Sequence, residues 1–182
     1  MRIVIVGTSG SGKSTLARAI AAAFGLSHVE LDALHWGPGW EALSRTDPQE
    51  FIRRVDTATA GAAWVADGNY VMVRDLVWRR ATHLIWLDYA RPVIMLRVLR
   101  RSLTRAVDQS ELYAGNREDW RRWFRPSHPI RWAWSTWPRR RAEYSALVGR
   151  DEYAHLHVLR LQRPGEAARV IERLRAHSAG EL

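Results

Sequence analysis

Short apolar runs alternate along this chain with longer segments in which apolar residues recur every three or four positions. The first run, Arg2–Val6 (RIVIV), is rich in β-branched residues and is typical of a strand buried on both faces of a parallel sheet. A glycine-rich turn follows it, and Thr46–Gln49 predicts a capping box at the start of a later helix. Further strands are predicted at 28–31, 64–66, 83–87 and 155–161, and helices at 14–24, 46–60, 92–105 and 165–177.

The order of these elements indicates the fold class. Strands that alternate with helices build parallel sheets, because each helix carries the chain back to the edge where the next strand begins. We therefore expect an α/β protein, a three-layer sandwich with helices on both faces of a mainly parallel five-stranded sheet. A tryptophan-rich helix is expected after residue 127, with an interruption near Pro138. No repeat or linker divides the chain, so residues 1–182 are predicted to form a single domain.

Composition narrows the class of protein. Of the 182 residues, 47% are hydrophobic and 26% are charged, which provides a core and excludes a disordered chain. The sequence has no cysteine, which excludes disulfides, thiol nucleophiles and cysteine-bound metals. No apolar run approaches the roughly 18 residues needed to span a bilayer. We therefore expect a cytoplasmic protein, either a monomer or a homodimer.

The positive charge is concentrated in one part of the chain. The net charge is +9, and the stretch from Arg97 to Arg141 holds twelve arginines and four acidic residues, a local charge of 12 − 4 = +8. Such a stretch either faces polyanions or carries a phosphate site. Lysine occurs once, at Lys13, among 28 basic residues. That lysine lies in the glycine-rich turn after the first strand, where a compact ammonium group can bind phosphate.

The sequence Gly7–Ser14 (GTSGSGKS) fits the pattern GxxxxGK[ST] between a buried strand and a helix. Glycines let consecutive backbone N–H groups point at phosphate oxygens, and the helix N-terminus adds positive potential. We therefore predict a P-loop NTPase that binds ATP or GTP with Mg²⁺. In this interpretation the Lys13 ammonium reaches the β- and γ-phosphates and the Ser14 hydroxyl binds Mg²⁺. The predicted nucleotide-binding residues in the loop are Gly10, Ser11, Gly12, Lys13, Ser14 and Thr15.

A second Mg²⁺ ligand is expected at the end of a neighbouring strand. Asp67 follows the apolar residues 64–66, which is the arrangement of a Walker-B carboxylate, so Asp67 and Ser14 are the predicted metal residues. Asp88, which follows the strand at 83–87, is the alternative.

Three further segments carry a family resemblance. The phosphate loop and the arginine-rich stretch resemble those of nucleoside-monophosphate kinases and small-molecule kinases. More closely, LDALHW at 31–36, DGNY at 67–70 and the Trp/Arg-rich third quarter resemble the adenylate-kinase-like proteins labelled DNA topology modulation proteins. The resemblance covers most of the chain and implies a P-loop kinase fold and ATP use. It also implies a flap on the acceptor side at 33–62 and a lid insertion at 106–127.

The phosphoryl acceptor is suggested by two departures from adenylate kinases. Those enzymes have arginine clamps for a monophosphate after their second and third strands, where this chain has His35 and Val71. Arg45 or Arg74 remain possible substitutes. The loop from Asp32 to His35 is instead similar to the acceptor loop of gluconate- and shikimate-type kinases. A hydroxyl acceptor benefits from a carboxylate base, so Asp32 is a predicted catalytic residue, and the predicted acceptor-binding residues are Asp32, His35, Trp36, Asn69 and Tyr70.

Arginines are predicted to complete the site. Arg97 and Arg101 are four residues apart and lie on one helix face. Their resemblance to the pair before the lid of similar kinases implies that Arg97 lies near the base and Arg101 near the phosphates. Arg101 and, in the lid, Arg117 are expected to stabilise the transferring phosphoryl group, with Lys13.

Other functions remain open. The main prediction is phosphoryl transfer from ATP or GTP to a hydroxyl of a metabolite or antibiotic, and a nucleoside-monophosphate kinase is the alternative. A nucleic-acid-associated NTPase is a further alternative, because arginines are interleaved with five tryptophans in the basic stretch. Helical spacing of Trp134 and Trp137, and of Trp120 and Trp123, favours packing roles instead. No NKxD motif supports a guanine-specific switch.

Overall fold

The computed structural model describes residues 1–108, 113–115, 129–178 and 180, and its centre is a five-stranded sheet. Every neighbouring pair of strands is parallel, and the strand order is β2-β3-β1-β4-β5. The prediction of a mainly parallel five-stranded sheet is therefore confirmed, with no antiparallel member among the described strands. The strands are β1 (Arg2–Gly7), β2 (Ser27–Glu30), β3 (Trp64–Asp67), β4 (His83–Leu87) and β5 (His157–Leu161).

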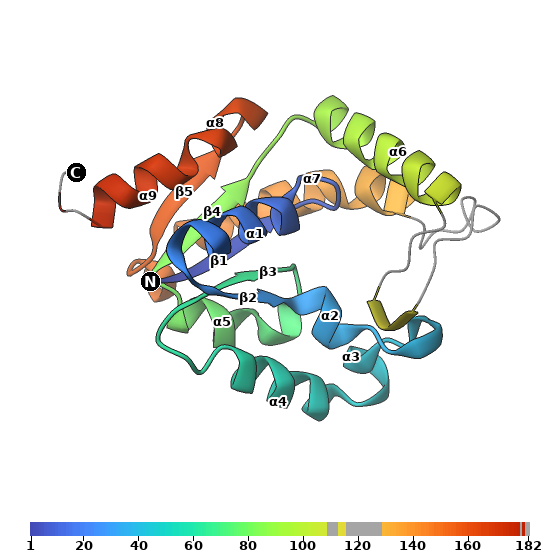
Figure 1. Ribbon diagram of the computed structural model, residues 1–182, viewed down its shortest axis with the longest axis horizontal. Coiled ribbons are helices and arrows are strands. Elements are labelled where there is room, and N and C mark those ends of the chain that lie inside the picture. The colour runs from blue at the N-terminus through green and yellow to red at the C-terminus, as the bar shows by residue number, and fades with distance from the viewer. Residues whose placement is uncertain (109–112, 116–128, 179, 181–182) are drawn as a thin grey trace.

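Helices cover both faces of this sheet. In the view of Figure 1, α4 and α5 lie together below the strands, and α8 and α9 lie above them. The α-helices are α1 (Lys13–Phe24), α2 (Leu31–His35), α3 (Leu43–Thr46), α4 (Pro48–Ala58), α5 (Arg74–Arg80), α6 (Arg91–Asp108), α7 (Pro129–Val148), α8 (Pro164–Ala168) and α9 (Val170–Ser178). Short 3₁₀ turns are η1 (Pro38–Trp40), η2 (Val71–Val73), η3 (Tyr113–Gly115) and η5 (Asp151–Tyr153).

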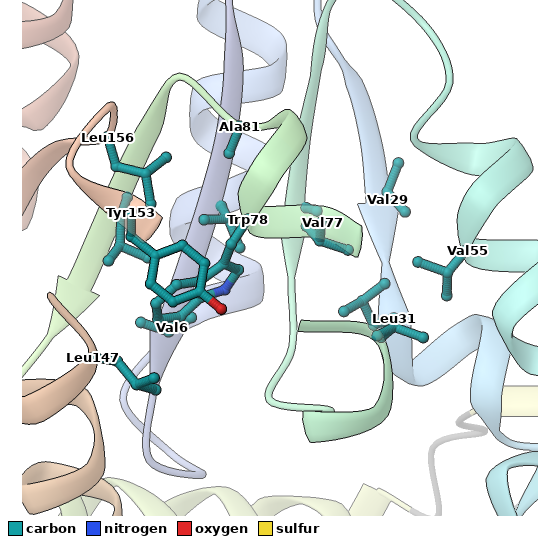
Figure 2. Packing of buried hydrophobic residues seen from close by; sticks show 14 of the residues in the cluster. Val6, Val29, Leu31, Val55, Val77, Trp78, Ala81, Leu147, Tyr153 and Leu156 are labelled. Atoms are coloured by element: carbon teal, nitrogen blue, oxygen red, sulfur yellow. The ribbon is translucent and has the colours of Figure 1, made fainter. Parts of the chain in front are cut away.

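The two faces of the sheet carry separate hydrophobic clusters, which is the pattern expected of a three-layer sandwich. One cluster joins alternate residues of the strands to α4, α5 and the second half of α7. Figure 2 shows part of this layer, with Val77 and Trp78 of α5 between Val55 of α4 on one side and Leu147 of α7 on the other. The other cluster joins the opposite strand residues to α1, α6 and α9. A strand that is buried on both faces needs apolar residues at successive positions, and the uninterrupted apolar run in β1 has this pattern.

Helix α7 is continuous, so the predicted interruption near Pro138 is wrong. Proline lacks the N–H that would bond the carbonyl of Trp134, four residues earlier. The guanidinium of Arg91 donates to that carbonyl at 3.0 Å and lies over the Trp134 ring, 3.4 Å from its centroid. A cation from α6 thus satisfies the group that proline leaves without a partner.

Other predicted boundaries change by a few residues. The N-cap of α4 is Asp47, whose carboxylate accepts the N–H of Glu50 at 3.0 Å, and not Thr46. Strand β2 ends at Glu30, so Asp32 lies in the first turn of α2 and not directly after a strand. The last strand begins at His157, and the last helix is divided between α8 and α9 at Arg169.

The described helices include none that is long and apolar enough to cross a membrane. The segment expected to form the acceptor-side flap, 33–62, contains η1, α3 and α4. Much of the segment expected to form the lid, 106–127, lies outside the described residues. That this segment forms a lid insertion stays a prediction.

Candidate active site

The carboxyl ends of three adjacent strands place the candidate site. Gly7 ends β1, Asp67 ends β3 and Glu30 ends β2, and the register pairs Ile5 with Asp67 and Asp67 with Glu30. Parallel strands bind ligands at this edge, because the loops that leave it converge on one crevice. The glycine-rich loop from Gly7 leads directly into α1, so its backbone lies at the same edge.

Glycine is required inside the loop for a steric reason. Gly10 has a φ of +83°, and a Cβ at this position would lie 2.2 Å from Cγ2 of Val98. The Ser11 N–H donates to the Thr8 carbonyl at 3.0 Å, which closes the turn. The Ser11 hydroxyl is buried and has no hydrogen-bond partner among the described residues. A buried hydroxyl in a glycine cradle at a helix N-terminus fits a phosphate oxygen.

Lys13 is positioned at the first residue of α1. Its Nζ donates to the Thr8 carbonyl at 3.3 Å, which curls the side chain back over the loop. Burial lowers the pKa of Lys13, and the charges of Asp32 and Asp67 oppose this shift. Arg101 and Arg140 act in the same direction as burial. The Lys13 ammonium therefore lies among two carboxylates and two guanidinium groups. Thr15 is exposed in the same first turn.

Ser14 and Asp67 are in direct contact. The Ser14 hydroxyl donates to Oδ2 of Asp67 at 2.6 Å, and the carboxylate is only 3% exposed. On its other side, Nε2 of His28 lies 2.8 Å from Oδ1 of Asp67. A hydroxyl and a carboxylate beside a phosphate cradle are the oxygen ligands that Mg²⁺ prefers, so these two residues fit the predicted metal. No three His, Asp or Glu side chains in the described ranges are arranged as a metal site made of protein alone.

Asp88, the alternative metal residue, is already paired. Arg160 donates to its Oδ2, with Nε at 2.9 Å, and Nε of Arg141 lies 3.1 Å from its Oδ1. The carboxylate is nearly buried between these two guanidinium groups. The geometry therefore favours Asp67 over Asp88 as the residue beside the phosphate loop.

Asp32 and Tyr70, both predicted to lie on the acceptor side, are in direct contact. The Tyr70 hydroxyl donates to Oδ1 of Asp32 at 2.6 Å, and burial raises the pKa of Tyr70, as does the nearby charge of Asp32. The hydroxyl is therefore a stable donor. His35 is 4% exposed, and burial lowers its pKa. Its Nε2 lies 2.7 Å from the Ser44 hydroxyl, and its ring packs against Trp36 at 4.5 Å between centroids.

Asn69 connects three elements, and its predicted contact with the acceptor stays a prediction. Its amide donates to the Gly7 carbonyl at 2.6 Å, and its Oδ1 accepts the Tyr144 hydroxyl at 2.8 Å. Asn69 therefore fastens the turn after β3 to the end of β1 and to α7.

Arg140 lies close to the candidate site, and the sequence did not single it out. Its Nη1 donates to the Asn69 carbonyl at 3.0 Å, and its charge lowers the pKa of both Lys13 and Tyr70. It is the middle residue of the run Arg139–Arg141, where only the phase of α7 distinguishes the inward residue. The sequence offered no other signal for it.

Two arginines of α6 reach the phosphate loop. Nη1 of Arg97 donates to the Ser11 carbonyl at 2.8 Å, so this side chain supports the loop backbone, and its predicted contact with the base stays a prediction. Nη2 of Arg101 lies 3.5 Å from the Ser9 hydroxyl. Arg117 lies outside the described residues, as do the lid residues Trp120 and Trp123.

Tyr113 connects η3 to the end of β2. Its hydroxyl donates to Oε1 of Glu30 at 2.6 Å, and burial together with this bond raises its pKa. Nothing in the sequence predicted this contact, because 83 residues separate the two partners.

No protein-family model and no curated protein sequence matches the chain. Solved structures do: a shikimate kinase from Acinetobacter baumannii in complex with shikimate has a TM-score of 0.58 at 15% identity, covering 98% of this chain and 93% of that chain. A shikimate kinase from Aquifex aeolicus has a TM-score of 0.54 at 13% identity, with 99% of each chain covered. A gluconokinase from Sinorhizobium meliloti 1021 has a TM-score of 0.50 at 21% identity, with 97% of each chain covered.

At these identities the likeness establishes the fold. The chain has the α/β fold of P-loop kinases, a parallel five-stranded sheet with helices on both faces, as predicted. These structural neighbours are small-molecule kinases, and they do not show the finer resemblance to adenylate-kinase-like DNA topology modulation proteins, which stays a prediction.

Proposed function

We propose that this protein is a P-loop kinase that transfers the γ-phosphoryl group of ATP or GTP to a hydroxyl of a small metabolite or antibiotic. The observation that carries the proposal is the placement of the Asp32 carboxylate. It interacts with the Lys13 ammonium and is held by the Tyr70 hydroxyl at 2.6 Å. A proton acceptor thus lies beside a loop shaped for phosphates, which is the requirement for phosphorylating an alcohol.

The residues divide the reaction between them. The acceptor oxygen forms a bond to the γ-phosphorus, the bond to the leaving nucleoside diphosphate breaks, and the acceptor's proton passes to Asp32. The Tyr70 hydroxyl keeps the carboxylate in one orientation. Mg²⁺, when bound at Ser14 and Asp67, supplies charge neutralisation at the phosphates. Lys13 and Arg101, together with Arg117 from the predicted lid, stabilise the charge that develops on the transferring group.

The arginine distribution favours a hydroxyl over a monophosphate acceptor. Arg74 forms an ion pair with Glu143 and stacks near Trp78, and Arg45 is exposed on α3, so neither is placed as a phosphate clamp. Arg140 is close enough to the acceptor side for its charge to lower the pKa of Tyr70. One guanidinium already bonded to the Asn69 carbonyl is a poorer monophosphate site than the two arginine clamps of adenylate kinases.

The test is release of ADP from Mg·ATP by the wild type and by Lys13→Ala. Three mixtures are compared: no acceptor, nucleoside monophosphates, and a pool of hydroxyl metabolites and aminoglycoside-type antibiotics. Stimulation by the hydroxyl pool alone, absent in Lys13→Ala, is the expected result. Stimulation by a monophosphate would make the protein a nucleotide kinase.

If no acceptor stimulates ADP release, the nucleic-acid alternative would be favoured instead. A specific observation supports testing it: Trp132 and Trp134 are 45% and 55% exposed on the arginine-rich helix α7. Neither belongs to the core, although Arg91 covers one face of the Trp134 ring. Retention on single-stranded DNA that weakens steeply with salt would be the corresponding result. Trp137 does pack, and its indole N–H donates to the Tyr89 carbonyl at 3.0 Å.

A further inference from the structure

The Asp67 carboxylate is held from two sides by residues of different elements. Ser14, in the first turn of α1, donates to Oδ2 at 2.6 Å. His28, on β2, lies with Nε2 2.8 Å from Oδ1. A carboxylate is only an acceptor, so this imidazole nitrogen carries the proton and donates. Both oxygens of a carboxylate that is 3% exposed therefore have a donor.

The sheet brings His28 to this carboxylate. Strands β2 and β3 are neighbours in the sheet (Figure 1). The register pairs His28 with Val65 and Glu30 with Asp67, so His28 lies two residues before the partner of Asp67. Side chains two positions apart share a face of the sheet, and Val65 packs in the cluster under α1. His28 is on this face as well, which is why its ring reaches Asp67 diagonally.

Ser14 and His28 stand in different relations to the predicted metal. The Ser14 hydroxyl is a predicted metal ligand; with a lone pair on the cation it would keep its proton, which it could still donate to Oδ2 of Asp67. The position of Oδ2 would then depend on a group that the metal itself engages. His28 makes no described hydrogen bond to the phosphate loop, so its bond to Oδ1 is compatible with the site both with and without the metal.

We propose that His28 is a positioning residue for Mg²⁺-dependent nucleotide binding: its N–H fixes Oδ1 of Asp67 so that Oδ2 stays directed at the Ser14 side of the metal site. Residues that orient a ligand in this way commonly contribute a factor of about 10 to 100 in metal affinity. The inference rests on the proposed nucleotide and Mg²⁺ site, and it is independent of the acceptor.

The experiment measures binding and needs no acceptor. Affinity for a non-hydrolysable ATP analogue is measured by calorimetry as Mg²⁺ is titrated from EDTA conditions to saturation. The variants are His28→Leu, which removes the donor, and His28→Gln, whose amide N–H reaches about as far as Nε2. His155→Leu is the matched control, because His155 precedes β5 at the opposite edge of the sheet and bonds the Trp78 carbonyl. Thermal melting of each variant checks folding, and His28→Ala replaces the leucine variant if leucine prevents folding.

Mg²⁺ is expected to strengthen binding of the ATP analogue. We expect the Mg²⁺ concentration that gives half of this strengthening to be about tenfold higher in His28→Leu, while the affinity for the analogue in EDTA is unchanged. His28→Gln should recover most of this loss, and His155→Leu should match the wild type. An unchanged Mg²⁺ requirement in His28→Leu, or an equal loss of affinity with and without Mg²⁺, would overturn the inference. Nucleotide binding by the wild type without turnover on any acceptor would reject the proposed function while leaving the role of His28 to the Mg²⁺ titration. Failure of the wild type to bind nucleotide at all would reject both.

Discussion

Replacing Asp32 by asparagine tests the central chemical assignment with a minimal change of shape. The asparagine retains an oxygen that can accept the Tyr70 hydroxyl, which donates to Oδ1 of Asp32 at 2.6 Å. What is lost is the negative charge and the ability to take a proton. Any large effect on turnover therefore reports on the chemistry and not on the packing of α2.

The expected magnitude follows from these losses. Removing a general base costs about 10²- to 10⁴-fold in kcat, which corresponds to roughly 3 to 5 kcal/mol of transition-state stabilisation. Affinity for Mg·ATP should change by less than about threefold. Asp32 is the strongest of the charges that raise the pKa of Lys13, but its removal takes no contact away from the triphosphate and removes a repulsive charge near it.

The assay combines steady-state turnover on the stimulating acceptor with calorimetric titration of the ATP analogue. Tyr70→Phe is the companion variant, because it keeps the carboxylate and removes only the hydroxyl that orients it. We expect about a tenfold loss of kcat there, the value of one hydrogen bond to a charged group. If Asp32→Asn retained wild-type turnover, or lost ATP affinity in proportion to kcat, the assignment of Asp32 to the acceptor side would be refuted.

Three other changes give separable outcomes. Arg140→Met should lower kcat/KM for the acceptor about 10- to 100-fold and leave Mg·ATP affinity within about threefold; a larger effect on ATP would place this cation on the nucleotide side instead. Gly68→Ala should reduce the free energy of unfolding in urea by about 1 to 3 kcal/mol, since a Cβ there would lie 2.7 Å from Cβ of Leu31 at a φ of +149°. Gly61→Ala, with no atom within 4 Å, should be near neutral, and equal losses would contradict the steric argument. His83, buried beside two other imidazoles, has its pKa lowered from 6.5 to about 4, so the folded state binds fewer protons and stability falls as the pH drops from about 6.5 to about 4, by at most about 3 kcal/mol. The free energy of unfolding of His83→Gln, measured in urea between pH 7 and pH 4, should lack this part of the fall with pH. A pH dependence equal to that of the wild type would be the contrary result.

Much of the fold was predictable from the sequence because its signals are local. Continuous apolar runs identify strands that are buried on both faces. Because these strands alternate with amphipathic helices, the sequence predicts a parallel sheet. The phosphate loop was equally predictable, since eight consecutive residues, Gly7–Ser14, hold both the conformational requirement and the chemistry. Asp67 and Asp32 could be proposed for a related reason: each lies at or shortly after the end of a predicted strand, and these strands end at the same edge of the sheet.

The tertiary structure decided which of several equivalent residues reach the site. Three arginines are consecutive at 139–141, and the phase of α7 turns Arg140 toward Asn69 and Arg141 toward Asp88. The same contact with Arg141, together with Arg160, removes Asp88 from competition with Asp67.

Partners that meet across the sheet or between helices left no mark in the sequence. His28 meets Asp67 only because β2 pairs with β3 in one register. Within α7, the Trp134 carbonyl that Pro138 leaves without its usual donor is bonded by Arg91 of α6. The sequence by itself determined the elements and the phosphate chemistry, because those depend on neighbours along the chain. The orientation of Asp67, the choice of Arg140 and the course of α7 depend on groups 39 to 71 residues apart, and only packing brings such groups together.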